Sequence, residues 1–202
     1  MKTNNYTESI KIIKNSKFSI KSLKTFVGRE GYGINANLYY NNKKVAFLLD
    51  SGNGGCLDID WDCVNKDGSP CIPPIVKEAE LYLRNLAKSL PKTTWGELSE
   101  ARGRVGIDDS MSYDWDDEAI MNTLIDYYSL IKTYNKWLKK VVIFNKKTKK
   151  IERYKCLKSD LVRKFKTEKG VEVGRDFFGR IGIILNDLPK KQAFEYFDKY
   201  TA

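Results

Sequence analysis

The feature that most constrains the fold is a stretch of alternating apolar and polar residues, interrupted by two groups of glycines, in the first third of the chain. Four segments within it are rich in Phe, Ile, Leu, Tyr and Val: 18–27, 32–40, 43–50 and 56–61. A period of two is typical of strands with one buried face. The pair Asn41-Asn42 suits a tight hairpin connection, because Asn tolerates positive φ. The sequence therefore predicts an antiparallel β-meander.

The rest of the chain mixes helical and strand patterns. Apolar residues recur at helical spacing over 74–90 and 114–140, which predicts two helices packed on the meander. Beyond them we expect a hairpin, a helix, a strand and a terminal helix, over 141–144 with 151–156, 159–169, 181–186 and 188–200. Residues 1–16 favour a loose arm or a short edge strand, and 91–112 a long acidic loop.

The expected fold class is thus α+β, with an N-terminal antiparallel β-meander and two packed helices, followed by a C-terminal β-hairpin–helix–strand–helix unit. The sequence contains no repeat or linker that divides it. We therefore expect a single domain over 1–202, in which 17–140 and 141–202 form candidate sub-lobes.

The glycines of GREGYG and of SGNGG favour turns over a phosphate-binding loop. A dinucleotide fingerprint lies between a strand and a helix, whereas strand-like sequence flanks GREGYG on both sides. In a meander both groups fall at the same end, where they form one exposed loop surface. Candidate partner-binding residues there are Arg29, Glu30, Tyr32 and Asn53.

The absence of histidine excludes most familiar catalytic sites. With no His among 202 residues, serine triads, zincin sites and Cys-His pairs are all ruled out. Asp58 and Asp60 are the remaining candidates for a divalent metal, although alternating Asp on a strand is usually its solvated face, and the spacing fails the EF-hand pattern. The four cysteines lack knuckle spacing, which makes a zinc site the weaker interpretation. We expect no cofactor and no enzymatic activity, and keep a divalent-metal nuclease as an alternative.

Positive charge is concentrated near the C-terminus. The chain carries 36 Lys and Arg against 26 Asp and Glu, and residues 132–169 alone hold fifteen basic residues against three acidic ones. Lysines on a protruding hairpin suit the phosphates of DNA or RNA, or an acidic protein, while a solvated turn is the plain alternative. The candidate residues are Lys146, Lys147, Lys149, Lys150, Arg153, Lys155, Arg163 and Lys164.

The segment FVGREGYGINANLYYNNKKVAFLLDSGNGG resembles a pattern found in small proteins of unknown function encoded by tailed bacteriophages, over about residues 20–62. The resemblance assigns no role to any residue. It implies a setting, namely an accessory phage protein in the cytoplasm of a bacterial host. Small non-enzymatic inhibitors of host defence, anti-CRISPR proteins among them, are common in that setting.

These observations lead to one expected function and two alternatives. We expect a non-enzymatic protein that binds, and inhibits, a host protein or nucleoprotein complex. The first alternative is direct binding of DNA or RNA through 132–169, and the second is the nuclease. The first residues, MKTNNYTESIKIIKNSKF, contain no apolar segment of a signal peptide, so we expect a cytoplasmic location and no membrane partner.

Overall fold

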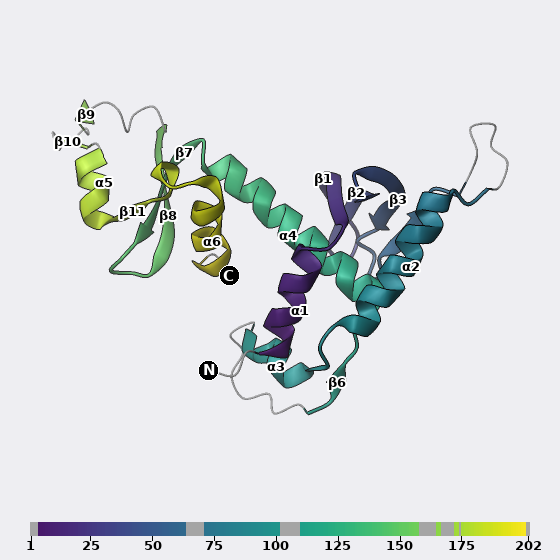
Figure 1. Cartoon of the computed structure of the whole chain (residues 1–202). Helices are drawn as coiled ribbons and strands as arrows, with labels where there is room; N and C mark the ends of the chain where they lie inside the picture. Colours follow the sequence, from purple (N-terminus) through teal and green to yellow (C-terminus); the bar gives the residue numbers. More distant parts are fainter. Residues whose placement is uncertain are drawn as a thin grey trace. The chain divides into compact units, whose positions relative to one another are not determined.

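The computed structural model has the predicted α+β architecture, with helices and antiparallel sheets (Figure 1). It describes residues 4–63, 71–101, 110–157, 165–166, 172–173 and 175–200. By its internal contacts the chain divides into two compact units, Met1–Tyr128 and Ser129–Ala202, which we describe separately. The expectation of a single domain stays a prediction.

Unit 1 contains the predicted meander. Its strands are hydrogen-bonded in sequence order: β1 (Phe18–Val27), β2 (Tyr32–Tyr40), β3 (Lys43–Asp50) and β4 (Asp58–Trp61). Asn41 and Asn42 have φ of 48° and 64° and form the β2–β3 connection, as expected from their tolerance of this conformation. All neighbouring strands are antiparallel.

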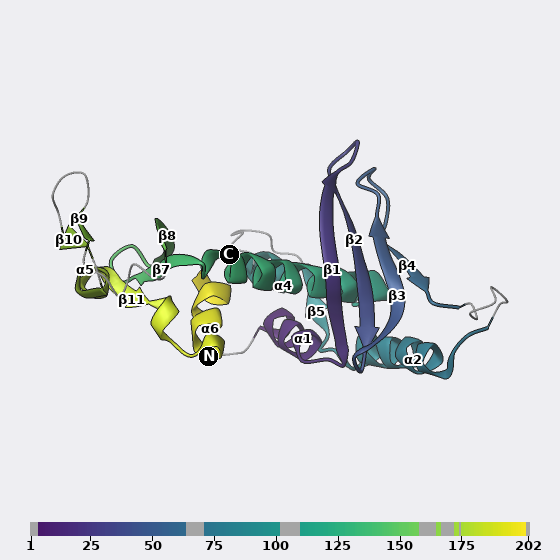
Figure 2. The same cartoon turned by 90° about the horizontal axis from the view of Figure 1, so that it is seen from above.

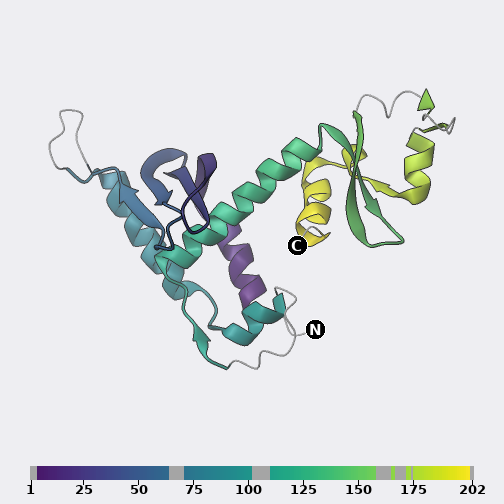
Figure 3. The same cartoon turned by 180° about the vertical axis from the view of Figure 1, so that it is seen from behind.

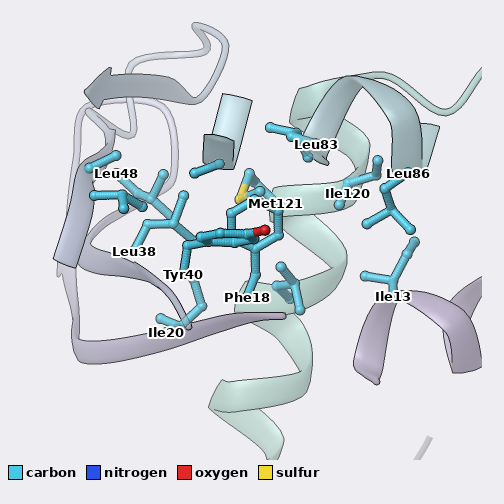
Figure 4. Close-up of a cluster of buried hydrophobic side chains, with 14 of the residues drawn as sticks. Ile13, Phe18, Ile20, Leu38, Tyr40, Leu48, Leu83, Leu86, Ile120 and Met121 are labelled. Carbon is cyan, nitrogen blue, oxygen red and sulfur yellow. The ribbon is translucent and has the colours of Figure 1, made fainter. Parts of the chain in front are cut away.

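Two helices supply the other half of the core of unit 1: α2 (Pro74–Ser89) and α4 (Asp117–Trp137), both predicted. Their apolar faces meet alternate residues of the sheet, such as Leu38 and Leu48, and all of these side chains are almost fully buried (Figure 4). Because α2 and α4 both pack on this side of the sheet, the opposite side of the meander faces away from them (Figure 2).

The prediction of a loose arm or edge strand at residues 1–16 is wrong. Residues Asn5–Lys14 form helix α1, and the side chain of Asn4 caps it by accepting a hydrogen bond from the backbone N–H of Thr7, at 3.2 Å. Ser9 and Ile13 are buried. Polar residues separate the buried positions, and Ile12 is 37% exposed, so the apolar residues of this segment do not show a clear helical period.

The prediction of one long loop over 91–112 is also wrong for the residues that the structure describes. They form β5 (Thr93–Thr94), α3 (Trp95–Ala101) and β6 (Ser112–Tyr113). Trp115 anchors this region, since its indole N–H donates to Oγ1 of Thr93 at 3.2 Å and its ring stacks on Tyr6. Residues 102–109 lie outside the described part.

Unit 2 has a three-stranded sheet in the order β11-β7-β8, formed by β11 (Gly182–Ile184), β7 (Lys140–Asn145) and β8 (Lys150–Leu157). Helix α5 (Arg175–Ile181) lies on one side of it and α6 (Lys190–Tyr200) on the other (Figure 3). Alternate residues of β7 therefore face two different apolar clusters. Val142 packs with Phe197 of α6, and Ile143 packs with Phe178 of α5.

The hairpin and the terminal helix of unit 2 agree with the predicted ones. The strand expected over 181–186 is shorter, because β11 covers only Gly182–Ile184 and Leu185–Asp187 form the 3-10 helix η2. The helix expected over 159–169 is wrong where the structure describes it. Phe165–Lys166 form strand β9, which pairs with β10 (Glu172–Val173). The other residues of the predicted helix lie outside the described ones. Helix α5 was not predicted, because its seven residues contain Gly179 and are too few to show a helical period.

Tyr134 of α4 presents a buried polar atom with no hydrogen-bond partner among the described residues. The residue is 1% exposed, and burial raises the pKa of its hydroxyl. An unpartnered buried hydroxyl destabilises the folded state. We therefore expect Tyr134→Phe to raise the free energy of unfolding by about 1 kcal/mol in urea denaturation. A loss of stability instead would mean that the hydroxyl has a partner.

Candidate functional site

The first candidate site is the end of the meander formed by residues 27–32 and 51–55, which we call the tip. The β1–β2 turn is closed by a hydrogen bond from the N–H of Gly28 to the carbonyl of Gly31, at 2.7 Å. The second turn begins at Asp50, whose Oδ1 accepts from the N–H of Gly52 at 2.8 Å. Gly52 has φ of +67°, a conformation that favours glycine.

The two turns are joined to each other, and Figure 2 shows them side by side at one end of the sheet. The N–H of Glu30 donates to the carbonyl of Gly52 at 2.8 Å, and the N–H of Arg29 donates to Oδ1 of Asn53 at 3.1 Å. Gly28 lies so close to Gly52 that a Cβ on Gly28 would come within 2.5 Å of the Gly52 carbonyl oxygen. The structure therefore brings the predicted residues Arg29, Glu30 and Asn53 together.

Apolar side chains extend from this tip. Tyr32, predicted as a partner-binding residue, is 76% exposed, and Val27 beside it is 80% exposed. The ring of Phe26 lies against Gly33 on the adjacent strand and is 38% exposed. The sequence analysis missed Val27 and Phe26, because residues that continue a strand pattern are expected to be buried. Their position next to the glycine turn is the signal that they end the strand in solvent.

The second candidate site is the β7–β8 turn, where Lys146, Lys147 and Lys149 are exposed and Lys150 begins β8. Asn145 holds the turn, since its Oδ1 accepts from the N–H groups of Lys147 at 2.9 Å and Thr148 at 3.2 Å. We call Lys146, Lys147, Lys149 and Lys150 the lysine turn. Their ammonium groups form a local concentration of positive charge at the end of a hairpin.

The other four predicted basic residues lie outside the lysine turn. Arg153 and Lys155 are exposed on β8, and the guanidinium carbon of Arg153 lies 5.2 Å from the centroid of the Trp137 ring. Arg153 therefore covers a partly buried aromatic residue of its own unit. Arg163 and Lys164 lie outside the described residues.

Binding of single-stranded nucleic acid would also use aromatic rings near the lysine turn, for which Phe144, Tyr154 and Phe165 are the candidates; the side chain of Phe165 lies outside the described part, and the other two pack within unit 2. Phe144 is 5% exposed, and Tyr154 is half-buried with its ring 4.9 Å from that of Phe178. The Tyr154 hydroxyl donates to Oε2 of Glu152 at 2.9 Å. Neither ring is free to stack on a base.

Asp58 and Asp60 are both exposed on β4 and face solvent. The next carboxylate, Asp62, accepts from the ammonium of Lys44 at 2.9 Å. Over the described ranges, no three Asp, Glu, Cys or His residues are grouped closely enough to hold a metal ion. Cys56, Cys63 and Cys71 are free thiols.

Cys56 has a raised thiol pKa, caused first by the negative charge of Glu118, to which the thiol also donates a hydrogen bond. Since Oε1 of Glu118 also accepts from the N–H of Leu57, Glu118→Gln retains an acceptor oxygen for that bond and removes the negative charge beside the thiol. We expect the variant to lower the Cys56 pKa and to raise its alkylation rate by iodoacetamide at pH 8 severalfold, because the thiolate is the reactive form. Peptide mass spectrometry measures the rate at each cysteine.

The internal control is Cys63. Its thiol pKa is raised first by burial and then by Glu80, Asp60 and Asp62, without a contribution from Glu118. The Cys63 rate should therefore be unchanged in Glu118→Gln. An equal acceleration of both thiols would indicate a loosened fold instead of an electrostatic effect.

Comparisons with known proteins add no assignment to these sites: no protein-family model matches the chain, and no curated protein or solved structure is significantly similar to it. Among the described residues, no helix is both long and apolar enough to cross a bilayer.

Proposed function

We propose that this chain is a non-enzymatic interaction protein that binds a host protein or nucleoprotein complex through the tip of its meander. The observation that carries the proposal is the joining of two turns into one surface from which Val27 and Tyr32 extend. On the resemblance of the hairpin to tailed-phage proteins, the host is a bacterium and the partner belongs to a cytoplasmic defence system.

The chemistry of the tip supports protein recognition. Tyrosine is one of the residue types that most often dominate binding energy, and the exposed Val27 adds apolar area beside Tyr32. The hydrogen bonds between the turns hold the backbone of the tip in place, which reduces the conformational entropy lost on binding. The exposed charged residues Arg29 and Glu30 lie in the same turn and add polar groups beside the apolar pair.

Affinity purification from a bacterium that expresses the protein tests this proposal. We expect a captured protein to be lost when Val27 is changed to Asp or Tyr32 to Ala, with at least about a tenfold loss of affinity for each. The matched control is Leu81→Asp on α2, since Leu81 is also an exposed aliphatic residue, at 59%. Equal capture by all the variants would contradict binding through the tip.

Direct binding of DNA or RNA is the second candidate, favoured by the exposure of the whole lysine turn. It predicts an affinity for naked nucleic acid that falls steeply as salt increases, and that is lost when all four lysines are changed to Glu. If naked DNA and RNA fail to bind at low salt, this candidate is rejected. For the nuclease alternative, the described residues place no third metal ligand beside Asp58 and Asp60. Incubating nucleic acids with the protein and Mg²⁺ or Mn²⁺ tests this alternative directly.

A further inference from the structure

On the side of the meander that faces away from α2 and α4, the types of side chain are arranged regularly. The register of the strands aligns two rows of side chains that run across the sheet from β1 to β4, and both rows point to this side. We call it the open face, and define it by Lys21, Asn37, Phe47 and Asp60 in one row and by Lys24, Asn35, Leu49 and Asp58 in the other.

Each row has the same order of chemical types: a lysine on β1, an asparagine on β2, an apolar residue on β3 and an aspartate on β4. The four charged residues are exposed. Both apolar residues lie on the side of the sheet that faces away from α2 and α4, where Leu49 is 36% exposed and Phe47 is half-buried. The open face is thus basic along one edge, acidic along the other and apolar in between.

The lysines of β1 and the aspartates of β4 are too far apart to form ion pairs with each other. Strands β1 and β4 are three strand spacings apart, about 14 Å, which is too far for an ion pair. The described residues contain no ion pair that involves Lys21, Lys24, Asp58 or Asp60. Lys21 instead places its Nζ 4.1 Å from the centroid of the Tyr39 ring, on the same face.

The edges of the sheet are poor sites for adding a strand. β1 has a bulge between Lys21 and Lys24, where Ser22 has φ of 55°, and β4 is only four residues long. Bulges, lysines and short edge strands all oppose pairing with another strand. A partner of this sheet is therefore expected on the face and not at the edge.

We propose that the open face binds the open face of a second copy of this chain, with the two-fold axis parallel to the strands. This rotation keeps the direction along the strands and exchanges the β1 and β4 edges. It places Lys21 opposite Asp60 of the second copy, and Lys24 opposite Asp58 of the second copy, in both directions. The apolar residues of β3 then lie between the charged edges, as in an aligned β-sandwich.

The dimensions indicate a dimer that dissociates on dilution. Four strands at about 4.8 Å and eight residues at about 3.3 Å give a face of at most about 500 Å². Two copies therefore bury at most about 1,000 Å², which is the size of a weak interface. The axis also places both tips at the same end of the dimer, so one dimer presents two copies of the proposed partner-binding surface.

Sedimentation equilibrium of the full chain tests the proposal with charge reversal. The wild type is expected to reach twice the monomer mass as concentration rises. Asp58→Lys with Asp60→Lys makes both edges basic, and Lys21→Glu with Lys24→Glu makes both acidic. Each double variant alone should have a dissociation constant at least about tenfold higher. An equimolar mixture of the two should dimerise again, because every facing pair is then of opposite charge.

The matched control is Lys146→Glu with Lys147→Glu, which changes the net charge as much as the acidic variant but lies in unit 2. It should leave the dimer unchanged. The proposal is overturned by a wild type that stays monomeric at millimolar concentration, by a dimer that neither double variant weakens, or by a mixture that does not reassociate. Circular dichroism confirms that each variant is folded, since all four positions are exposed.

Discussion

Replacing Gly28 by alanine is expected to destabilise unit 1 by about 3 kcal/mol and to abolish binding through the tip. The added Cβ would come within 2.5 Å of the carbonyl oxygen of Gly52 and 2.7 Å of its carbon atoms. These are backbone atoms of a turn held by its own hydrogen bonds, so they cannot move aside as a flexible side chain does. Relief of the overlap requires the two turns to separate, which breaks the bonds from Glu30 and Arg29.

The control is Gly31→Ala in the same turn. A Cβ at Gly31 meets no atom within 4 Å, and its φ is not in the left-handed region. We expect the free energy of unfolding and the capture of the partner to remain near wild type in this variant. Urea denaturation and the affinity purification described above measure both quantities. If Gly28→Ala bound as well as Gly31→Ala, the joined turns would not be the binding surface.

Local features of the meander could be predicted from sequence, whereas long-range contacts could not. Asn41 and Asn42 form their turn because Asn tolerates positive φ, so the two residues alone predict the turn. Gly28 is different, because its φ is ordinary and its small size is needed only by Gly52, 24 positions further along the chain. The sequence pattern predicts both turns at one end of the sheet, whereas the hydrogen bonds that join them appear only in the folded structure.

The wrong predictions for residues 1–16 and 91–112 also arise from contacts between distant parts of the chain. Helix α1 buries few residues, so its stability depends on docking and on the Asn4 cap more than on an apolar period. Helix α3 is seven residues long and is docked on α1 through Glu97, whose Oε1 accepts from the backbone N–H of Asn5 at 3.2 Å. Short elements stabilised by single tertiary contacts have little signal in sequence. The lysines of the β7–β8 turn are exposed as expected, because a cluster of like charges favours solvent wherever the fold places it, while their role in binding stays a prediction.

The second large effect is expected in unit 2, where Phe197→Ala should lower the free energy of unfolding by about 4 kcal/mol. Phe197 is fully buried, and its ring centroid lies 5.1 Å from those of both Tyr134 and Trp137. Truncation removes these contacts and leaves a cavity that the sheet and α4 cannot fill without moving. For a unit of this size, such a loss is a large share of the total stability.

The same variant decides whether the two units unfold independently. Trp137 lies in unit 2, and the other three tryptophans lie in unit 1, so fluorotryptophan labels followed by ¹⁹F NMR in urea report on each unit separately. We expect Phe197→Ala to lower the midpoint of the Trp137 signal alone. Leu38→Ala, the matched truncation of a fully buried residue in unit 1, should lower the other three alone. If all four signals shift together in both variants, then α4, which begins in unit 1 and ends in unit 2, couples them into the single cooperative domain that the sequence predicts.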